Sequence, residues 1–161
     1  ACCLAAVPSI FSIANVRWFE GDIEAAAALY GEARALAERT GDGRLAGMAA
    51  QHLGVLATVR GDDAGARAHY EDSLAQYRAL GLGDDVCAAL TNLGMLHLYA
   101  GRWDDAGRAL GEAAEVARGA GNRAHEAQVT ANLADLYLAR RAFGPAAVAA
   151  TSALAVAERV G

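Results

Sequence analysis

The sequence contains no lysine, and its 14 basic residues are all arginines spread along 161 residues. They face 19 acidic residues, which leaves a net charge of −5 and no basic stripe for a phosphate backbone. We therefore expect no nucleic acid to bind this segment. Aromatic residues make up only 6% of the chain and prolines number 2, whereas much of the 55% apolar content is alanine, the strongest helix former. This composition predicts an all-α protein.

Cysteines are few as well. Cys2, Cys3 and Cys87 make an odd number without Cys-x-x-Cys spacing, and sequence neighbours rarely satisfy disulfide geometry. We interpret them as reduced, buried thiols of a cytoplasmic protein. The apolar opening, residues 1–16, has no basic start and is shorter than the roughly 20 residues that span a bilayer. It predicts an amphipathic helix from within a longer chain, and no membrane partner.

Residue patterns for chemistry are also missing. "HEAQV" has Val129 where a zinc-protease box needs its second histidine, and the glycine-rich stretches 41–47 and 81–86 lack a phosphate-binding lysine. No serine or threonine lies in a nucleophile-elbow context. The histidines have no metal-ligand spacing; they are His52, His69, His97 and His125. We therefore predict no enzyme, no metal and no cofactor.

What the chain does have is regular glycine. Glycines recur every twenty residues, and Arg141 occupies the one exceptional position; they are Gly21, Gly41, Gly61, Gly81, Gly101, Gly121 and Gly161. Glycine is favoured just past a helix end, and the acidic residues that follow suit a helix start. They include Asp22, Asp42 and Asp62, with Asp84, Asp85, Asp104 and Asp105 in the next turns. The pattern predicts eight helices of about 16–18 residues, each roughly 25 Å long.

Side-chain size repeats every forty residues. Large aliphatic residues recur at Ile13, Leu53, Leu93 and Leu133, and each is followed by a minimal one, at Ala14, Gly54, Gly94 and Ala134. Alanine recurs at Ala26, Ala66, Ala106 and Ala146. Alternating large and small residues suit closely packed antiparallel helices, and such self-similarity is typical of a solenoid.

These positions resemble the tetratricopeptide repeat (TPR) signature, in its long variant. The resemblance is carried by Leu93-Gly94, Gly101, Trp103, Ala106, Leu110 and Ala113, with similar sets in the other copies. It implies a right-handed α-α superhelix of eight antiparallel helices, with repeats of about 1–40, 41–80, 81–120 and 121–161 in a single solenoid domain. Trp103 is expected to fill the gap within its helix pair, and Asp104 and Asp105 to lie in the first turn of the next helix.

The resemblance also implies a concave binding face, lined by the first helix of each pair. By register, the lining residues are Phe11, Asn15, Trp18, Phe19, Met48, Gln51, Val55, Thr58, Val59, Thr91, Met95, Leu98, Tyr99, Gln128, Asp135 and Leu138, with Asn92 and Asn132 at the edge. This face is apolar, and without lysine it lacks the clamp that family members use for a C-terminal carboxylate. An amphipathic helix or an extended apolar segment fits it better. Helices of the protein's own missing segments are the alternative occupant.

These expectations predict a non-enzymatic protein- or peptide-binding module. The alanine- and arginine-rich style resembles repeat arrays of bacterial transcriptional and signalling regulators, which implies a sensing or scaffolding role. Two alternatives stand beside it: a stand-alone adaptor, and a receptor for a signalling peptide or a small apolar ligand. Because both chain ends are apolar, we also expect either a longer array or self-association through the terminal repeats.

Overall fold

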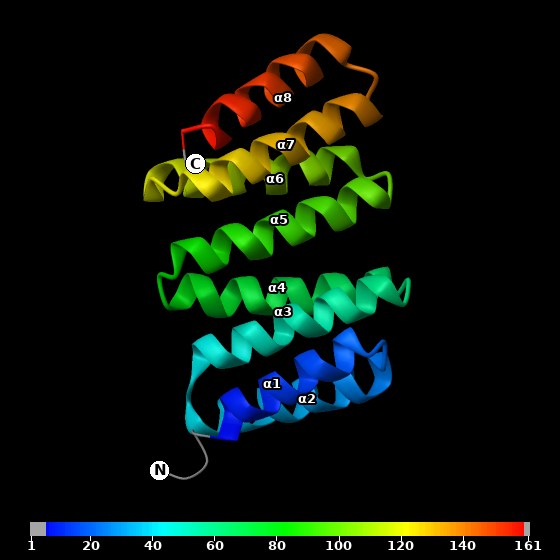
Figure 1. Ribbon diagram of the computed structural model, residues 1–161, viewed down its shortest axis with the longest axis vertical. Helices are drawn as coiled ribbons and strands as arrows, with labels where there is room; N and C mark the ends of the chain where they lie inside the picture. Colours follow the sequence, from blue (N-terminus) through cyan, green and yellow to red (C-terminus); the bar gives the residue numbers. More distant parts are fainter. Residues whose placement is uncertain (1–5, 160–161) are drawn as a thin grey trace. The chain divides into compact units, whose positions relative to one another are not determined.

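The computed structural model describes residues 6–159, and these form eight α-helices without any strand. The helices are α1 (Ala6–Phe19), α2 (Ile23–Thr40), α3 (Gly43–Val59), α4 (Asp63–Ala79), α5 (Gly83–Tyr99), α6 (Trp103–Ala120), α7 (Arg123–Ala139) and α8 (Phe143–Ala157). The predicted all-α fold and the eight predicted helices are confirmed. Each odd-numbered helix packs antiparallel to the one that follows it (Figure 1).

The expected glycine turns end the helices. Six glycines of the twenty-residue series adopt a left-handed conformation, from Gly21 (φ 81°) to Gly121 (φ 67°). Arg141, the predicted exception, is the one other described residue with positive φ, at 56°. Its side chain replaces glycine in a conformation that disfavours a Cβ atom.

The acidic residues after these glycines act in two ways. The carboxylates of Asp22, Asp42 and Asp62 accept hydrogen bonds from backbone N–H groups at 3.0, 3.0 and 2.9 Å, as capping predicts. Asp104 and Asp105 lie inside the first turn of α6 without capping it, where the helix dipole still favours negative charge.

The chain divides into two compact units, residues 1–81 (unit 1) and 82–161 (unit 2). Each unit holds two of the predicted repeats. That all four repeats form a single domain stays a prediction. In unit 1, α2 links the pairs by packing against α3, and in unit 2, α6 and also α5 pack against α7.

Close helix contact depends on the small residues predicted for it. A Cβ atom built on Gly54 would lie 2.6 Å from Cε1 of Tyr70, and one on Gly94 would lie 2.6 Å from Cγ of Leu110. Each glycine therefore lets a large side chain of the paired helix rest on its backbone. Leu93 is 6% exposed, which confirms its expected core position.

Trp103 corrects one sequence expectation. It is the first residue of α6 and is 43% exposed, so it does not fill the gap between α5 and α6. Leu110, two turns further along α6, packs against Gly94 of α5 instead. Of the cysteines, Cys87 is a free, buried thiol as predicted, while Cys2 and Cys3 lie outside the described residues.

Candidate binding surface

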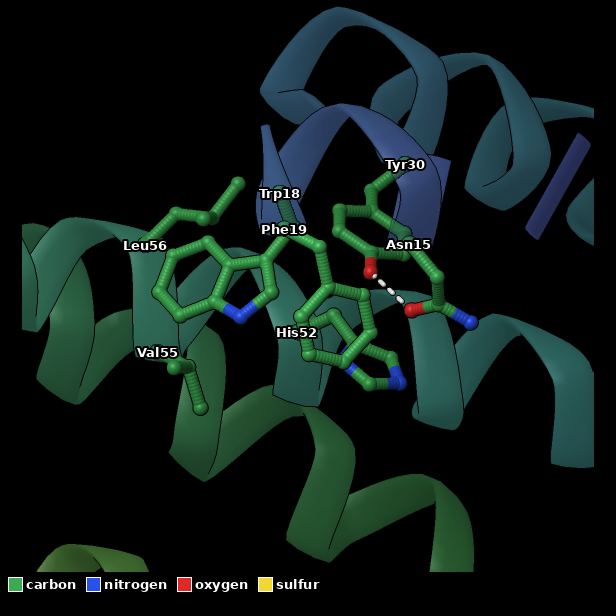
Figure 2. Close-up of a pocket in the computed structure, with 7 residues that line it drawn as sticks. All are labelled: Asn15, Trp18, Phe19, Tyr30, His52, Val55 and Leu56. Carbon is green, nitrogen blue, oxygen red and sulfur yellow. Dashed lines mark hydrogen bonds between the residues drawn. The ribbon is translucent and has the colours of Figure 1, made fainter. Parts of the chain in front are cut away.

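Unit 1 contains a hollow of about 300 Å³, which we call the aromatic pocket. Its lining comes from α1, α2 and α3, and Figure 2 shows the side chains converging on it. The lining residues are Asn15, Trp18, Phe19, Tyr30, His52, Val55 and Leu56. Four of them, Asn15, Trp18, Phe19 and Val55, belong to the predicted concave face, and the structure brings these four together.

A stacked pair forms one wall of the aromatic pocket. The rings of Tyr30 and His52 lie parallel, with centroids 4.7 Å apart and an interplanar angle of 4°. The ring of Phe11 meets His52 edge-on at 5.8 Å. Burial lowers the pKa of His52 because a desolvated imidazole resists protonation. This wall is therefore neutral and aromatic near neutral pH.

Polar groups in the aromatic pocket are few and placed at one side. The hydroxyl of Tyr30 donates a hydrogen bond of 2.6 Å to Oδ1 of Asn15, which Figure 2 shows as a dashed line. That bond fixes the Asn15 side chain and leaves its amide N–H groups without a partner among residues 6–159. A fixed amide beside an apolar hollow can donate to a backbone carbonyl of a bound segment.

The rim of the aromatic pocket is exposed and apolar. Phe19 is 86% exposed, and Val59, one turn beyond Val55 on α3, is 56% exposed. Apolar side chains that adjoin an apolar hollow enlarge the continuous apolar area that faces water, and such patches are typical of interaction sites. The pocket and rim together form a surface suited to an apolar side chain.

Other residues of the predicted face are tied to the interior of unit 1. Gln51 accepts a hydrogen bond of 3.2 Å from the hydroxyl of Tyr77, and Thr58 donates one of 2.9 Å to the carbonyl of Gly54. Met48 packs partly buried against the core. Phe11 is only 5% exposed, so its placement on the binding face is corrected to a core position.

In unit 2 the predicted residues separate into three groups. Thr91 and Leu98 are buried, at 7% and 9% exposure, and Thr91 donates its hydroxyl to the carbonyl of Cys87 at 2.7 Å, so both belong to the core. Tyr99 is 77% exposed. Asn92, Met95 and Asn132 are half-buried, and Gln128 is exposed.

Asp135 and Leu138 line a different hollow, of about 420 Å³, between α7 and α8. We call it the end groove. Alanines form its floor, and Leu138 and Phe143 stand at its edges with exposures of 51% and 67%. The alanines of the lining include Ala134, Ala146, Ala147 and Ala150.

Three pocket residues were missed by sequence reasoning: Tyr30, His52 and Leu56. Tyr30 has the same repeat position as Tyr70, which the forty-residue period places at a contact within a helix pair. The sequence therefore offered no reason to expect Tyr30 in a pocket. His52 follows the predicted Gln51 directly, so a wider reading of the α3 face would have included it. Residues 6–159 contain no cluster of three or more His, Cys, Asp or Glu side chains, and we assign no metal ligands.

No helix within residues 6–159 combines the length and apolarity needed to cross a membrane. The tetratricopeptide repeat family model matches residues 85–159. These residues are tetratricopeptide repeats. Comparison with curated protein sequences gives no match.

Solved structures of TPR-like proteins resemble nearly the whole chain. BtubC (BKLC) from P. vanneervenii is 18% identical with a TM-score of 0.84, over 96% of this chain and 64% of that one. TPR-like repeats from a Podosopora anserina protein assigned as a kinesin light chain are 14% identical with a TM-score of 0.78, over 96% and 76%. Aspartyl phosphate phosphatase F from Bacillus subtilis is 14% identical with a TM-score of 0.73, over 97% and 50%.

The chain thus spans less than two thirds of the length of BtubC and half of the phosphatase. At these identities the likeness establishes the fold alone. Unit 1 therefore has the TPR-like fold by structural similarity, and unit 2 has it by sequence as well.

Proposed function

We propose that this chain is a non-enzymatic protein- or peptide-binding module whose aromatic pocket holds an apolar side chain of the partner. The TPR fold is in general a protein-interaction scaffold. The observation that carries the proposal is the convergence of four register-predicted residues, Asn15, Trp18, Phe19 and Val55, on one open apolar hollow.

The size and polarity of the aromatic pocket favour a macromolecular partner. Its volume of about 300 Å³ is at the lower limit of the roughly 300–1,000 Å³ typical of small-ligand sites. That volume accommodates one large side chain, while the exposed Phe19 and Val59 extend the apolar contact beyond the hollow. An amphipathic helix supplies an anchor residue and flanking apolar residues at the required spacing.

Asn15 adds specificity to this arrangement. Its amide is fixed by Tyr30, so it can donate to the partner's backbone without a further loss of side-chain freedom. The surface carries no positive charge among the seven lining residues. This supports an apolar segment over a carboxylate terminus as the ligand.

The biological setting belongs to the same proposal. We place the module in the sensing or scaffolding part of a bacterial transcriptional or signalling regulator, in the cytoplasm, where the buried free thiol of Cys87 suits a reducing compartment. The alternatives are a stand-alone adaptor and a receptor for a signalling peptide or a small apolar ligand. Tyr99 and the other exposed unit 2 residues of the predicted face stay in the proposal as a secondary contact surface.

The test is a selection of amphipathic helical peptides from a displayed library, followed by fluorescence anisotropy of labelled peptides at about 1 µM protein. Trp18→Ala and Phe19→Ala should each weaken binding about tenfold or more, as expected for aromatic side chains that a bound partner covers. Val16→Ala is the matched control, because Val16 is an apolar residue of the same helix, 53% exposed and outside the pocket. Equal losses for the control and the pocket variants, or no loss for either pocket variant, would refute the pocket assignment.

Small-ligand binding is distinguished by a second measurement. Trp103→Phe leaves Trp18 as the sole tryptophan, so quenching of its fluorescence reports occupation of the pocket. Quenching by small apolar compounds, with no selected peptide bound, would favour the receptor alternative.

A further inference from the structure

The α8 residues of the end groove in unit 2 occupy the same repeat positions as a surface of α6, forty residues earlier, and α7 covers that surface. Positions forty residues earlier than Ala147 and Ala150 are Gly107 and Leu110 on α6. There, α7 packs against α6, and a Cβ atom built on Gly107 would lie 3.6 Å from Cδ2 of Leu136. Leu110 is fully buried, whereas Ala147 and Ala150 are exposed. The end groove therefore has the register of a helix-docking surface, and no helix of residues 6–159 covers it.

The chain also carries a helix with a matching free face. Because the period is forty, α1 has the register of α7, and Ile13 and Val16 correspond to Leu133 and Leu136. Leu136 is 2% exposed because α7 lies on α6, whereas Val16 is 53% exposed and Ile13 is 51% exposed. The apolar residues that α7 uses for docking are thus present on α1 and uncovered by the described residues.

The two free surfaces are complementary in size at the central contact. Inside unit 2, the contact joins Leu136 to Gly107. The equivalent contact between α1 and the end groove would join Val16 to Ala147, a pair with the same number of side-chain carbon atoms. Ile13 likewise matches its counterpart Leu133 in volume. A small-residue groove and a row of aliphatic side chains at equal spacing pack by the same ridge-and-groove fit as α6 and α7.

We infer that the chain self-associates head to tail, with α1 of one copy docked in the end groove of the next. The inference does not depend on the aromatic pocket, which Asn15, Trp18 and Phe19 line on α1. The contact is heterologous, so it continues from copy to copy or closes into a ring. It is weaker than its internal counterpart, because Ser9 replaces Val129 and Ala150 replaces Leu110, which removes apolar contact at both places.

The test is sedimentation equilibrium of the 161-residue chain over roughly 10–500 µM, the range that reports micromolar dissociation constants. We expect the weight-average mass to rise with concentration. Val16→Arg should abolish the rise by placing a charge on the docking face of α1, and Ala147→Arg should abolish it by placing one in the groove. Val148→Arg is the matched control, because Val148 is 71% exposed on α8 and does not line the end groove, so its mass should follow the unmodified chain.

Mixing the two variants tests the direction of the contact. Val16→Arg retains an intact groove and Ala147→Arg retains an intact α1, so an equimolar mixture should form a complex of two copies and nothing larger. Circular dichroism of each variant first confirms that the helices are retained.

Three results would overturn the inference. One is a chain that stays monomeric at every concentration. Another is loss of association in Ala147→Arg but not in Val16→Arg, which indicates a symmetric contact between two α8 ends. The third is loss in Val148→Arg, which assigns the contact to the other face of α8. Peptide binding in the aromatic pocket, measured at about 1 µM, is unaffected by any of these results.

Discussion

Gly94 offers the sharpest test of how the helix pairs are packed. A Cβ atom on Gly94 would lie 2.6 Å from Cγ and 2.7 Å from Cδ2 of Leu110, and 3.4 Å from the backbone N of the same residue. Carbon atoms in contact normally stay about 3.5–4.0 Å apart, so Gly94→Ala requires a shift of about 1 Å. Leu110 is fully buried, and Cγ is close to its backbone, so the side chain cannot swing away.

The expected magnitude is the difference between two opposing terms. Overpacking of a buried contact costs about 1–3 kcal/mol, whereas alanine gains about 1 kcal/mol over glycine inside a helix. Gly94→Ala should therefore be neutral to destabilising by about 2 kcal/mol. Gly111→Ala on α6 is the matched control, because a Cβ atom there meets nothing within 4 Å. It should gain about 1 kcal/mol from helix propensity alone.

The assay is urea unfolding followed by far-ultraviolet circular dichroism. The helix-propensity gain is common to both variants, so Gly94→Ala should be less stable than Gly111→Ala by about 1–3 kcal/mol. Leu110→Ala should make Gly94→Ala harmless, because it removes both contacting carbons, and a double-mutant cycle measures that coupling. If Gly94→Ala is as stable as Gly111→Ala, the close approach of α5 and α6 is wrong.

Three further predictions test other parts of the structure. Leu93→Ala should destabilise the protein by about 2–5 kcal/mol in the same urea assay, because it opens a cavity in the core of unit 2; a loss below about 0.5 kcal/mol would contradict the burial of Leu93. Arg141→Gly should raise stability by about 0.5–1 kcal/mol, since it relieves a left-handed residue at some cost in chain entropy, and an unchanged or lower melting temperature would argue against that conformation. Burial lowers the pKa of His52 in the folded state, so the unfolded chain binds its proton more readily, and stability should fall as pH drops below about 6.5. His52→Gln should reduce that loss between pH 7.5 and 5, and an unchanged pH dependence would be inconsistent with the buried, neutral imidazole.

The helices and their ends could be predicted from the sequence because they depend on local chemistry. Glycine at a left-handed position and aspartate as a cap act within a few residues, so their spacing marks each turn directly. The forty-residue period likewise predicted which small residues lie at the helix contacts, as Gly54 and Gly94 show.

The binding surface was predicted only in part, because equal register does not ensure equal exposure. Phe11, Thr91 and Ala131 occupy the same position in their repeats, yet Phe11 and Thr91 are buried and Ala131 is exposed. Phe11 packs on Tyr30 and His52, and Thr91 bonds to its own helix. Trp103 fails in the opposite sense, since it begins α6 at the helix end, where no neighbouring side chains enclose an indole. Such outcomes depend on contacts between distant residues, which the period does not record.

Two positions of the forty-residue repeat account for the tight contacts within the helix pairs. The first helix of each pair contributes a minimal residue, and the second contributes the residue that faces it. In the second and third repeats the minimal residue is glycine, at Gly54 and Gly94, and the facing residues Tyr70 and Leu110 rest directly on the glycine backbone. At both places the large side chain fills the space that the glycine leaves.

The same pair of positions, filled differently, borders both hollows described above. In the first repeat the minimal residue is Ala14, so no glycine backbone faces the Tyr30 ring. That ring stacks on His52 and bonds to Asn15 instead, which forms a wall of the aromatic pocket. In the fourth repeat both positions are alanine, Ala134 and Ala150, and the missing volume is the end groove. Departures from the glycine–large pair thus create the surfaces at which we expect partners to bind.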